Sequence, residues 1–266
     1  MKTALTIGGS DSSGGAGIQA DLKTFSVLGV FGMSAITVVT AQNTLGIKEL
    51  VELAPDIVRK QIDTTASDIQ VDATKTGMLS NIGIIEAVEA AIKLNNLAPY
   101  VCDAVLNSSG ARATESSDAR NGIIKRLFPL ATVVTAGLTD AAALAGVAES
   151  SLSTVAAAKD AAKRIAGMGA RAVVVTGIVS AEQVIDVFFD GVEMYELAGK
   201  LQPKEKTHGS GSAFSAAITA GLANRMSLLD ATDQAKQLVN MAIQYGDGQG
   251  RGTTPVNVLA FAPKKK

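Results

Sequence analysis

Short apolar runs alternate along the chain with longer segments in which apolar residues recur every three or four positions. Residues 3–8 are apolar and end in glycines, which predicts a buried strand, and residues 15–28 repeat apolar side chains at helical spacing. The same pattern predicts further strands at 35–39, 73–78, 100–106, 131–135 and 172–176, and a hairpin of strands 183–190 and 192–198. It predicts further helices at 56–68, 81–94, 117–127, 139–144, 154–168, 211–223 and 228–245.

Strands that are separated by helices imply right-handed crossovers and a mainly parallel sheet. No internal repeat or linker divides the 266 residues, so we predict one α/β domain over residues 1–266. Ligands of open parallel sheets bind beyond the carboxyl ends of the strands. The loops that follow the predicted strands are thus the candidates for a binding site. Met78, at one such strand end, is either a ligand-facing residue or part of the core.

The composition argues against several classes of protein. With 47% hydrophobic and 18% charged residues the chain is typical of globular proteins, and its formal net charge of −1 gives no electrostatic basis for binding nucleic acid or an anionic membrane. Cys102 is the single cysteine and His208 the single histidine, which excludes an intrachain disulfide and argues against a Cys/His zinc site. Because Cys102 lies in a predicted buried strand, we interpret it as a core residue. The sequence shows no signal-peptide pattern, and we expect a cytoplasmic protein.

Two glycine-rich loops are the strongest chemical signal in the sequence. Residues 206–215, Lys-Thr-His-Gly-Ser-Gly-Ser-Ala-Phe-Ser, run from a turn into a helix of small residues and predict a phosphate cradle of unpaired backbone N–H groups. Gly209 and Gly211 would let these groups converge on the anion. Residues 8–17 form a second flexible turn that opens a helix. The two loops suggest two ligands that meet in one cleft.

Two common nucleotide-binding motifs fit this sequence poorly. Residues 15–20 match G-x-G-x-x-A after a strand, but no acidic residue occurs between Leu22 and Lys48 to hold a ribose. The sequence also contains no G-x-x-x-x-G-K-[ST] motif. We therefore predict neither a dinucleotide site nor a Walker-type ATP site.

Several side chains in the glycine-rich loops allow two interpretations. We interpret His208 as a loop histidine that bonds the backbone rather than as part of a triad with Ser210 or Ser212, because no orienting acid is evident. Asp11 is either a functional carboxylate or the cap of its turn. Asp21 is either functional or exposed on the first helix.

Five blocks of sequence together resemble one protein family. The blocks are residues 9–25, Ala41-Gln42-Asn43-Thr44, Lys75-Thr76-Gly77-Met78-Leu79, Thr207-His208-Gly209-Ser210-Gly211 and residues 252–257 with Pro255-Val256-Asn257. In this order they resemble the hydroxymethylpyrimidine/phosphomethylpyrimidine kinases of thiamin biosynthesis, a ribokinase-like family, over essentially the whole chain. The resemblance implies a three-layer α/β/α fold with a mainly parallel central sheet, and usually a homodimer. It also implies transfer of the γ-phosphoryl group of ATP, with Mg²⁺, to the pyrimidine hydroxymethyl group and then to its monophosphate.

The resemblance further implies a role for individual residues. The pyrimidine pocket would be formed by Gly9, Asp21, Gln42, Met78 and Val105. The anion hole and catalytic position would be formed by Gly209, Ser210, Gly211 and Ser212. The amide of Gln42 offers both an acceptor and a donor, which matches the edge of an aminopyrimidine. Asp140 would help to hold Mg²⁺, and Asp140 and Thr176 would face the nucleotide.

The chain departs from the family pattern on the phosphoryl side. Ser212 replaces a catalytic cysteine, and a serine hydroxyl is a poorer base because its pKa lies well above that of a thiol. Gly137 and Asp140 lie in a segment where the family has Thr-Pro-Asn-x-x-Glu, and Thr176 replaces a lysine. The loop at 106–110 also lacks the family's frequent lysine. The pyrimidine side, in contrast, is nearly intact.

Three functions are consistent with this asymmetry. We expect an ATP-dependent kinase for hydroxymethylpyrimidine and its phosphate, slowed at Ser212 because loss of general-base assistance costs about 10²- to 10⁴-fold. One alternative is a pyrimidine-binding protein with little or no catalysis, acting as a sensor or as the partner of another enzyme. The other is a kinase for pyridoxine-like alcohols. For the adenine ring we expect helices near residues 179–182 and 239–245.

Overall fold

The computed structural model of the chain describes residues 1–106, 117–202 and 204–262. The loop positions 107–110, discussed above for their missing lysine, lie outside these residues. Within the described part, no helix is both long enough and apolar enough to cross a bilayer.

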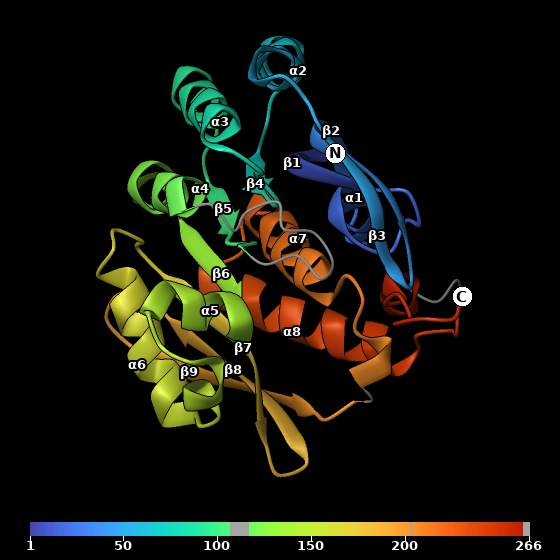
Figure 1. Ribbon diagram of the computed structural model, residues 1–266, viewed down its shortest axis with the longest axis vertical. Coiled ribbons are helices and arrows are strands. Elements are labelled where there is room, and N and C mark those ends of the chain that lie inside the picture. Colours follow the sequence, from blue (N-terminus) through green and yellow to red (C-terminus); the bar gives the residue numbers. More distant parts are fainter. Residues whose placement is uncertain (107–116, 203, 263–266) are drawn as a thin grey trace.

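One twisted sheet organises the molecule (Figure 1). Its strands, in spatial order, are β3 (Gly46–Glu52), β2 (Val30–Asn43), β1 (Lys2–Asp11), β4 (Ala73–Thr76), β5 (Tyr100–Asp103), β6 (Val133–Gly137), β7 (Val173–Ser180), β8 (Gln183–Phe189) and β9 (Met194–Lys200). Neighbouring strands from β2 to β7 are parallel, whereas β3 at one edge and β8 and β9 at the other are antiparallel to their neighbours. The mainly parallel sheet predicted from the alternation of elements is confirmed.

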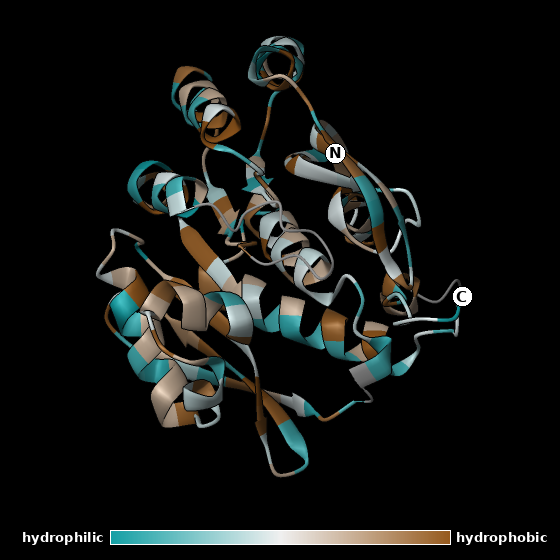
Figure 2. Cartoon of the chain, viewed as in Figure 1, coloured by the Kyte–Doolittle hydropathy of each residue, from teal (hydrophilic) through white to brown (hydrophobic). Residues whose placement is uncertain are grey.

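Helices cover both faces of the sheet, giving three layers. The α-helices are α1 (Gly17–Val27), α2 (Pro55–Asp68), α3 (Ile82–Leu94), α4 (Ser117–Gly122), α5 (Leu138–Ala145), α6 (Val155–Ala166), α7 (Ser210–Ala223) and α8 (Leu228–Gln244). Buried residues of α3, α5 and α6 pack on one face with Cys102 and Val134, and those of α7 and α8 pack on the other with Val101 and Val133. Adjacent residues of one strand thus enter opposite cores, as the two-residue repeat of a strand requires. Figure 2 shows hydrophobic residues along the central strands and mixed faces on helices such as α8.

Local sequence explains where several helices begin. Pro55 opens α2, where its missing N–H removes no helical hydrogen bond. The side chains of Asn81, Thr154 and Ser227 cap α3, α6 and α8 by accepting a backbone N–H from the first turn. Each cap satisfies a backbone N–H that has no partner within the helix and so fixes the residue at which the helix begins.

The observed elements differ from the predicted ones mainly at the edges. Strand β3 was not predicted, because its residues are mostly exposed and carry little apolar alternation. Strand β2 extends well beyond the predicted 35–39 on both sides, since its parallel pairing with β1 begins at Val30 and its antiparallel pairing with β3 continues to Asn43. The predicted helix at 117–127 changes after Gly122 into a π-helical turn over Ile123–Leu127.

Candidate active site

A cavity of about 330 Å³ opens at the carboxyl ends of β1, β4, β5 and β6. Every site residue proposed from the sequence lines it: Gly9, Asp21, Gln42, Met78, Val105, Asp140, Thr176, Gly209, Ser210, Gly211 and Ser212. The two glycine-rich loops also meet there, as the sequence predicted. The volume suits a small ligand, since such pockets commonly span about 300–1,000 Å³.

The first loop is organised around the carboxylate of Asp11. This carboxylate accepts hydrogen bonds from the backbone N–H groups of Ser13, Gly15 and Ala16 at 2.8, 3.1 and 2.8 Å. It also accepts one from the Ser13 hydroxyl and lies 3.0 Å from Nε2 of His208. Burial acts to raise the pKa of Asp11, but the bonds from His208 and Ser13 outweigh it and lower the pKa to about 2. Asp11 therefore caps its own turn as an ionised group.

The second loop presents the amino-terminal turn of α7 to the cavity. Gly209 precedes this helix with φ of +79°, and a Cβ there would collide with the carbonyl oxygen of Gly15. A Cβ on Gly211 would meet no atom within 4 Å, because this residue faces the open cavity. Backbone N–H groups in a first helical turn have no acceptor within the helix, which applies to Gly211 and Ser212, and both of these residues line the cavity. Of the two glycines proposed from the sequence, only Gly209 adopts a positive φ.

The hydroxyl of Ser212 faces the first loop. The backbone N–H of Gly17 donates to Ser212 Oγ at 3.1 Å. This bond uses one acceptor site of the oxygen and leaves the hydroxyl proton available to another partner. Ser212 thus joins the start of α7 to the start of α1.

The side of the cavity that is formed by Gly9, Met78 and Gln42 combines a close-packed wall with a polar rim. Gly9 lies against Met78, whose terminal methyl carbon would be 2.8 Å from a Cβ on Gly9. At the rim, Oε1 of Gln42 accepts a bond from the Thr40 hydroxyl at 3.2 Å. The backbone of Gln42 is also held, since its N–H donates to Ser12 Oγ at 2.8 Å. The amide of Gln42, which lines the cavity, also carries two N–H donors.

A buried ion pair forms part of the cavity floor. Nζ of Lys75 lies 2.7 Å from Oδ1 of Asp21, and the Thr6 hydroxyl donates to Oδ2 of the same carboxylate at 2.6 Å. The exposed fractions of the Lys75 and Asp21 side chains are 1% and 2%. The alternative that Asp21 is exposed on the first helix is therefore wrong. Lys75 was not singled out from the sequence, because its partner lies 54 residues away on another element.

Asp103 completes the floor, and it forms no ion pair with any residue of the described part of the chain. Its carboxylate accepts hydrogen bonds from the hydroxyls of Thr135 and Ser215 at 2.8 and 3.0 Å. Burial raises the pKa of Asp103, as does the nearby Asp21 carboxylate, against the opposing effects of Lys75 and the two hydroxyls. One lysine between two carboxylates leaves a net negative charge beneath the cavity when all three groups are ionised.

Asp103→Asn is expected to stabilise the chain at neutral pH, because it removes a poorly compensated buried charge while keeping a similar shape. The raised pKa means that the folded wild type binds this proton more tightly than the unfolded chain does. Wild-type stability should therefore gain from this group as the pH falls through the folded pKa toward the unfolded value of about 3.9. The advantage of the variant should accordingly be largest at neutral pH and shrink toward about pH 4, as measured by urea unfolding across that range.

Asp72→Asn is the matched control for this pH dependence. The bond from Lys2 lowers the pKa of Asp72, so its ionised form stabilises the folded chain and its loss should destabilise it at neutral pH. A less stable Asp103→Asn variant at neutral pH would contradict the assignment of a poorly compensated charge to Asp103.

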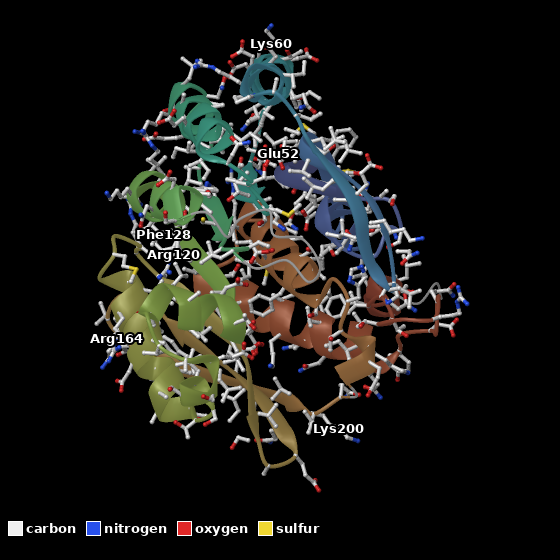
Figure 3. The ribbon with its side chains drawn as sticks, viewed as in Figure 1. Glu52, Lys60, Arg120, Phe128, Arg164 and Lys200 are labelled. Carbon is white, nitrogen blue, oxygen red and sulfur yellow. The ribbon has the colours of Figure 1, made fainter. Side chains whose placement is uncertain are left out.

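A second cavity of about 450 Å³ adjoins the first. The residues that line both cavities are Thr176, Thr207, Ser210, Gly211 and Phe214. Inside the second cavity Nζ of Lys236 lies 2.9 Å from Oδ2 of Asp186, whose Oδ1 accepts the backbone N–H of Gly177 at 2.9 Å. Lys200, labelled in Figure 3 near the end of β9, also lines this cavity. The first turn of α7 thus stands between two adjoining binding spaces.

The helix that we expected at residues 179–182 is absent. These residues end β7 and form the turn into β8, because Val179 pairs with Val184 in an antiparallel ladder. The expected helix at 239–245 is the last part of α8. Val179 and Val239 nevertheless both line the second cavity.

Asp140 is the carboxylate that the sequence proposed for a cation. Asp140, in the first turn of α5, lines the first cavity, and its Oδ1 accepts the backbone N–H of Leu106 at 3.1 Å. Among residues 1–106, 117–202 and 204–262, no group of three His, Cys, Asp or Glu side chains is placed to hold a metal ion. A single carboxylate fits Mg²⁺, which commonly binds through one or two carboxylates together with substrate phosphates and water.

The single histidine and the single cysteine of the sequence have different environments. The ring of His208 bonds the Asp11 carboxylate, so its partner is an acid rather than the backbone, and that acid was missed because it lies 197 residues away. Cys102 is buried in β5, and burial raises the pKa of its thiol to about 11. Cys102 is therefore a core residue, as predicted.

Comparison with known proteins agrees with this geometry. The family model of phosphomethylpyrimidine kinase matches residues 11–257. A hydroxymethylpyrimidine/phosphomethylpyrimidine kinase of Rhizobium meliloti (strain 1021) is 42% identical over 255 residues, covering 94% of this chain and 94% of the relative. A pyridoxine kinase of Bacillus subtilis (strain 168) is 41% identical over 248 residues, covering 92% and 91%.

A solved structure extends the similarity to the fold. The ADP complex of Bacillus subtilis pyridoxal kinase superimposes with a TM-score of 0.89 at 38% identity, covering 98% of each chain. The layers, the sheet and the sequence similarity over nearly the whole length lead to one assignment. The chain belongs to the phosphomethylpyrimidine kinase family, a family of phosphotransferases with the ribokinase-like fold.

Proposed function

We propose that this chain acts as a single ribokinase-like kinase domain in thiamin biosynthesis. Its substrate is 4-amino-5-hydroxymethyl-2-methylpyrimidine, to which it transfers the γ-phosphoryl group of ATP with the help of Mg²⁺. It then phosphorylates the resulting monophosphate. The family assignment and the relatives that are named for this activity support the proposal.

The observation that carries the proposal is the pair of adjoining cavities with the amino terminus of α7 between them. One cavity is lined by the residues proposed for the pyrimidine, and the other, which is the larger of the two, would take the nucleotide. Group transfer requires the two reacting ligands to approach each other closely. The shared wall at Ser210 and Gly211 is where they would do so.

The residues that line the two cavities have separable tasks. The backbone N–H groups of Gly211 and Ser212 stabilise the charge that develops on the transferring phosphoryl group. Asp140 holds Mg²⁺, and Thr176 faces the phosphates from β7. Gln42 and Asp21 orient the pyrimidine on the opposite side. When bound, ATP would supply the phosphoryl group and Mg²⁺ would neutralise part of the charge that develops on it.

A coupled assay of product formation tests the proposal when it is run beside calorimetric binding of the same alcohols. The purified chain is supplied with Mg·ATP and either the hydroxymethylpyrimidine, its monophosphate or pyridoxine. We expect ADP release with both pyrimidines. Pyrimidine binding without ADP release would instead establish a pyrimidine-binding protein with little or no catalysis.

A pyridoxine-type kinase is the second candidate, because the similarity to the Bacillus subtilis pyridoxine kinase is nearly as high as that to the pyrimidine kinase. The pyridoxine arm of the same assay measures it. A kcat/KM for pyridoxine above that for the hydroxymethylpyrimidine would replace the first proposal with the second.

Gln42→Leu is expected to weaken pyrimidine binding by about 1–3 kcal/mol, which is the cost of leaving a buried polar edge of the ligand unpaired. The fold should be retained because the side chain stands at the rim and its main-chain bonds to Ser12 do not need the amide. Calorimetric titration with the alcohol measures the loss. Unchanged affinity in a folded variant would remove Gln42 from the site.

We propose in addition a cytoplasmic homodimer. The cytoplasm is supported by Cys102, which is buried and forms no disulfide. The homodimer is supported by exposed apolar side chains on the β2–β3 hairpin, where Val39 pairs with Val51 across the ladder. Phe31 on β2 is also exposed. Apolar side chains gathered on an outer hairpin favour contact with another protein surface. Sedimentation analysis of the purified chain measures the oligomeric state.

A further inference from the structure

Two segments that are far apart in the sequence interlock at the wall of the first cavity. Nε2 of His208 lies 3.0 Å from Oδ2 of Asp11, although 197 residues separate them. Their side chains have exposed fractions of 12% and 3%, so water competes little for this contact. One segment carries the loop before α1, and the other carries the phosphate cradle before α7.

The backbones of the two segments also approach closely. A Cβ on Gly15 would collide with the ring of His208, and a Cβ on Gly209 would collide with the carbonyl oxygen of Gly15. The Gly17–Ser212 bond makes a third contact between the same segments. The His208–Asp11 bond, the close approach of Gly209 to Gly15 and the Gly17–Ser212 bond thus connect the two segments in three places. Together they define how the phosphate cradle lies against the first loop.

His208 is held at its main chain as well. Its N–H donates to the carbonyl oxygen of Thr254 at 3.2 Å, and its carbonyl oxygen accepts from Val256 at 3.0 Å. The backbone of His208 is therefore fixed to the carboxyl-terminal segment, while its side chain reaches across to Asp11. Because Asp11 is ionised and can only accept, the ring nitrogen that faces it must be the donor.

We propose that His208 is a positioning residue, which donates from Nε2 to Asp11 and thereby fixes the position of the phosphate cradle relative to the first loop. The proposal rests on the proposed kinase function. It assigns to the ring no contact with the reacting atoms. The required property is a hydrogen-bond donor at the distance of Nε2, and any side chain that supplies such a donor should serve in part.

Substitutions that keep or remove the donor test this assignment. His208→Gln retains an N–H group of similar reach, whereas His208→Leu has similar bulk and no donor. We expect the leucine variant to lose about 100-fold in kcat, the order of loss for a misplacement of about 1 Å. Its KM for the pyrimidine alcohol should change less than kcat. The glutamine variant should stay within about 10-fold of wild type.

A matched control separates positioning from general destabilisation. Asp72→Asn removes a partly buried ion pair with Lys2 away from both cavities, so it should lower the melting temperature and leave kcat unchanged. Retention of wild-type kcat by His208→Leu would overturn the proposal. Equal losses in the leucine and glutamine variants would also overturn it, since they would assign chemistry to the ring itself.

Nuclear magnetic resonance supplies a readout that does not depend on activity. Since the chain contains one histidine, ¹⁵N-labelled histidine gives the signals of His208 alone. We expect a protonated Nε2 whose hydrogen is protected from exchange by the bond to Asp11. An unprotonated Nε2 would overturn the proposal. If the wild type proves inactive as a kinase, the proposed function fails while this measurement still decides the placement of the ring.

Discussion

Gly211→Val is expected to lower kcat for phosphoryl transfer by about 10²- to 10³-fold, the cost of losing a preorganised backbone donor to developing charge. The structure provides room for the new side chain, since a Cβ at this position meets no atom within 4 Å and φ is not positive. That room is the cavity itself, where an anion would approach the first turn of α7. The variant should therefore fold and fail at its ligand.

Binding measurements make this prediction specific to the cradle. Affinity for ATP or for the phosphorylated pyrimidine should fall more than affinity for the unphosphorylated alcohol. Gly248→Val is the matched control, because that glycine also meets no atom within 4 Å, has no positive φ and lines neither cavity. Equal losses for all three ligands, or a comparable loss in the control, would point to unfolding.

Gly209 would be the wrong glycine for this experiment. A side chain there needs the left-handed region at φ of +79° and collides with the carbonyl oxygen of Gly15. The consequence is a displaced loop rather than a blocked cradle. Sequence alone does not separate the two glycines, since each stands beside a serine in the same turn and only the fold shows which one faces the neighbouring chain segment.

Local sequence patterns predicted most of the helices and strands, because the residues that begin and end these elements lie within them or next to them. The helix at α2 has its proline, and the hairpin of β8 and β9 has Asp190-Gly191 at its turn. Strand β3 escaped prediction because an exposed edge strand needs no regular apolar face and its existence depends on pairing with β2. Its boundaries are thus set by a tertiary contact.

The loops of the site were predictable, whereas their partners were not. Glycine-rich turns after strands identify the cavity, since the carboxyl ends of parallel strands share one edge. The ion pair of Lys75 with Asp21 depends on β4 lying beside β1, an order that the sequence does not state. Asp103 enters the same floor because β5 is the next strand along. Strand order therefore decides which charged residues meet.

Ser212→Cys is expected to raise kcat by about 10-fold or more, within the range of general acid–base assistance. A thiol has an unperturbed pKa of about 8.5, far below that of an alcohol, and a position at a helix amino terminus lowers it further. The structure adds a second cause. The backbone N–H of Gly17 that now donates to Ser212 Oγ would donate to the sulfur, and a hydrogen bond to the charged form favours the thiolate.

The gain depends on whether the nucleotide side still functions with Gly137, Asp140 and Thr176 in place of the family's usual residues. Steady-state kinetics of Ser212→Cys, run beside calorimetric binding of ATP to both proteins, separates the two requirements. Ser212→Ala serves as the control, because it removes the hydroxyl and the bond from Gly17 while supplying no base. If the cysteine restores nothing while ATP fails to bind and the pyrimidine still does, the kinase proposal falls. A pyrimidine-binding role would then be the function that remains.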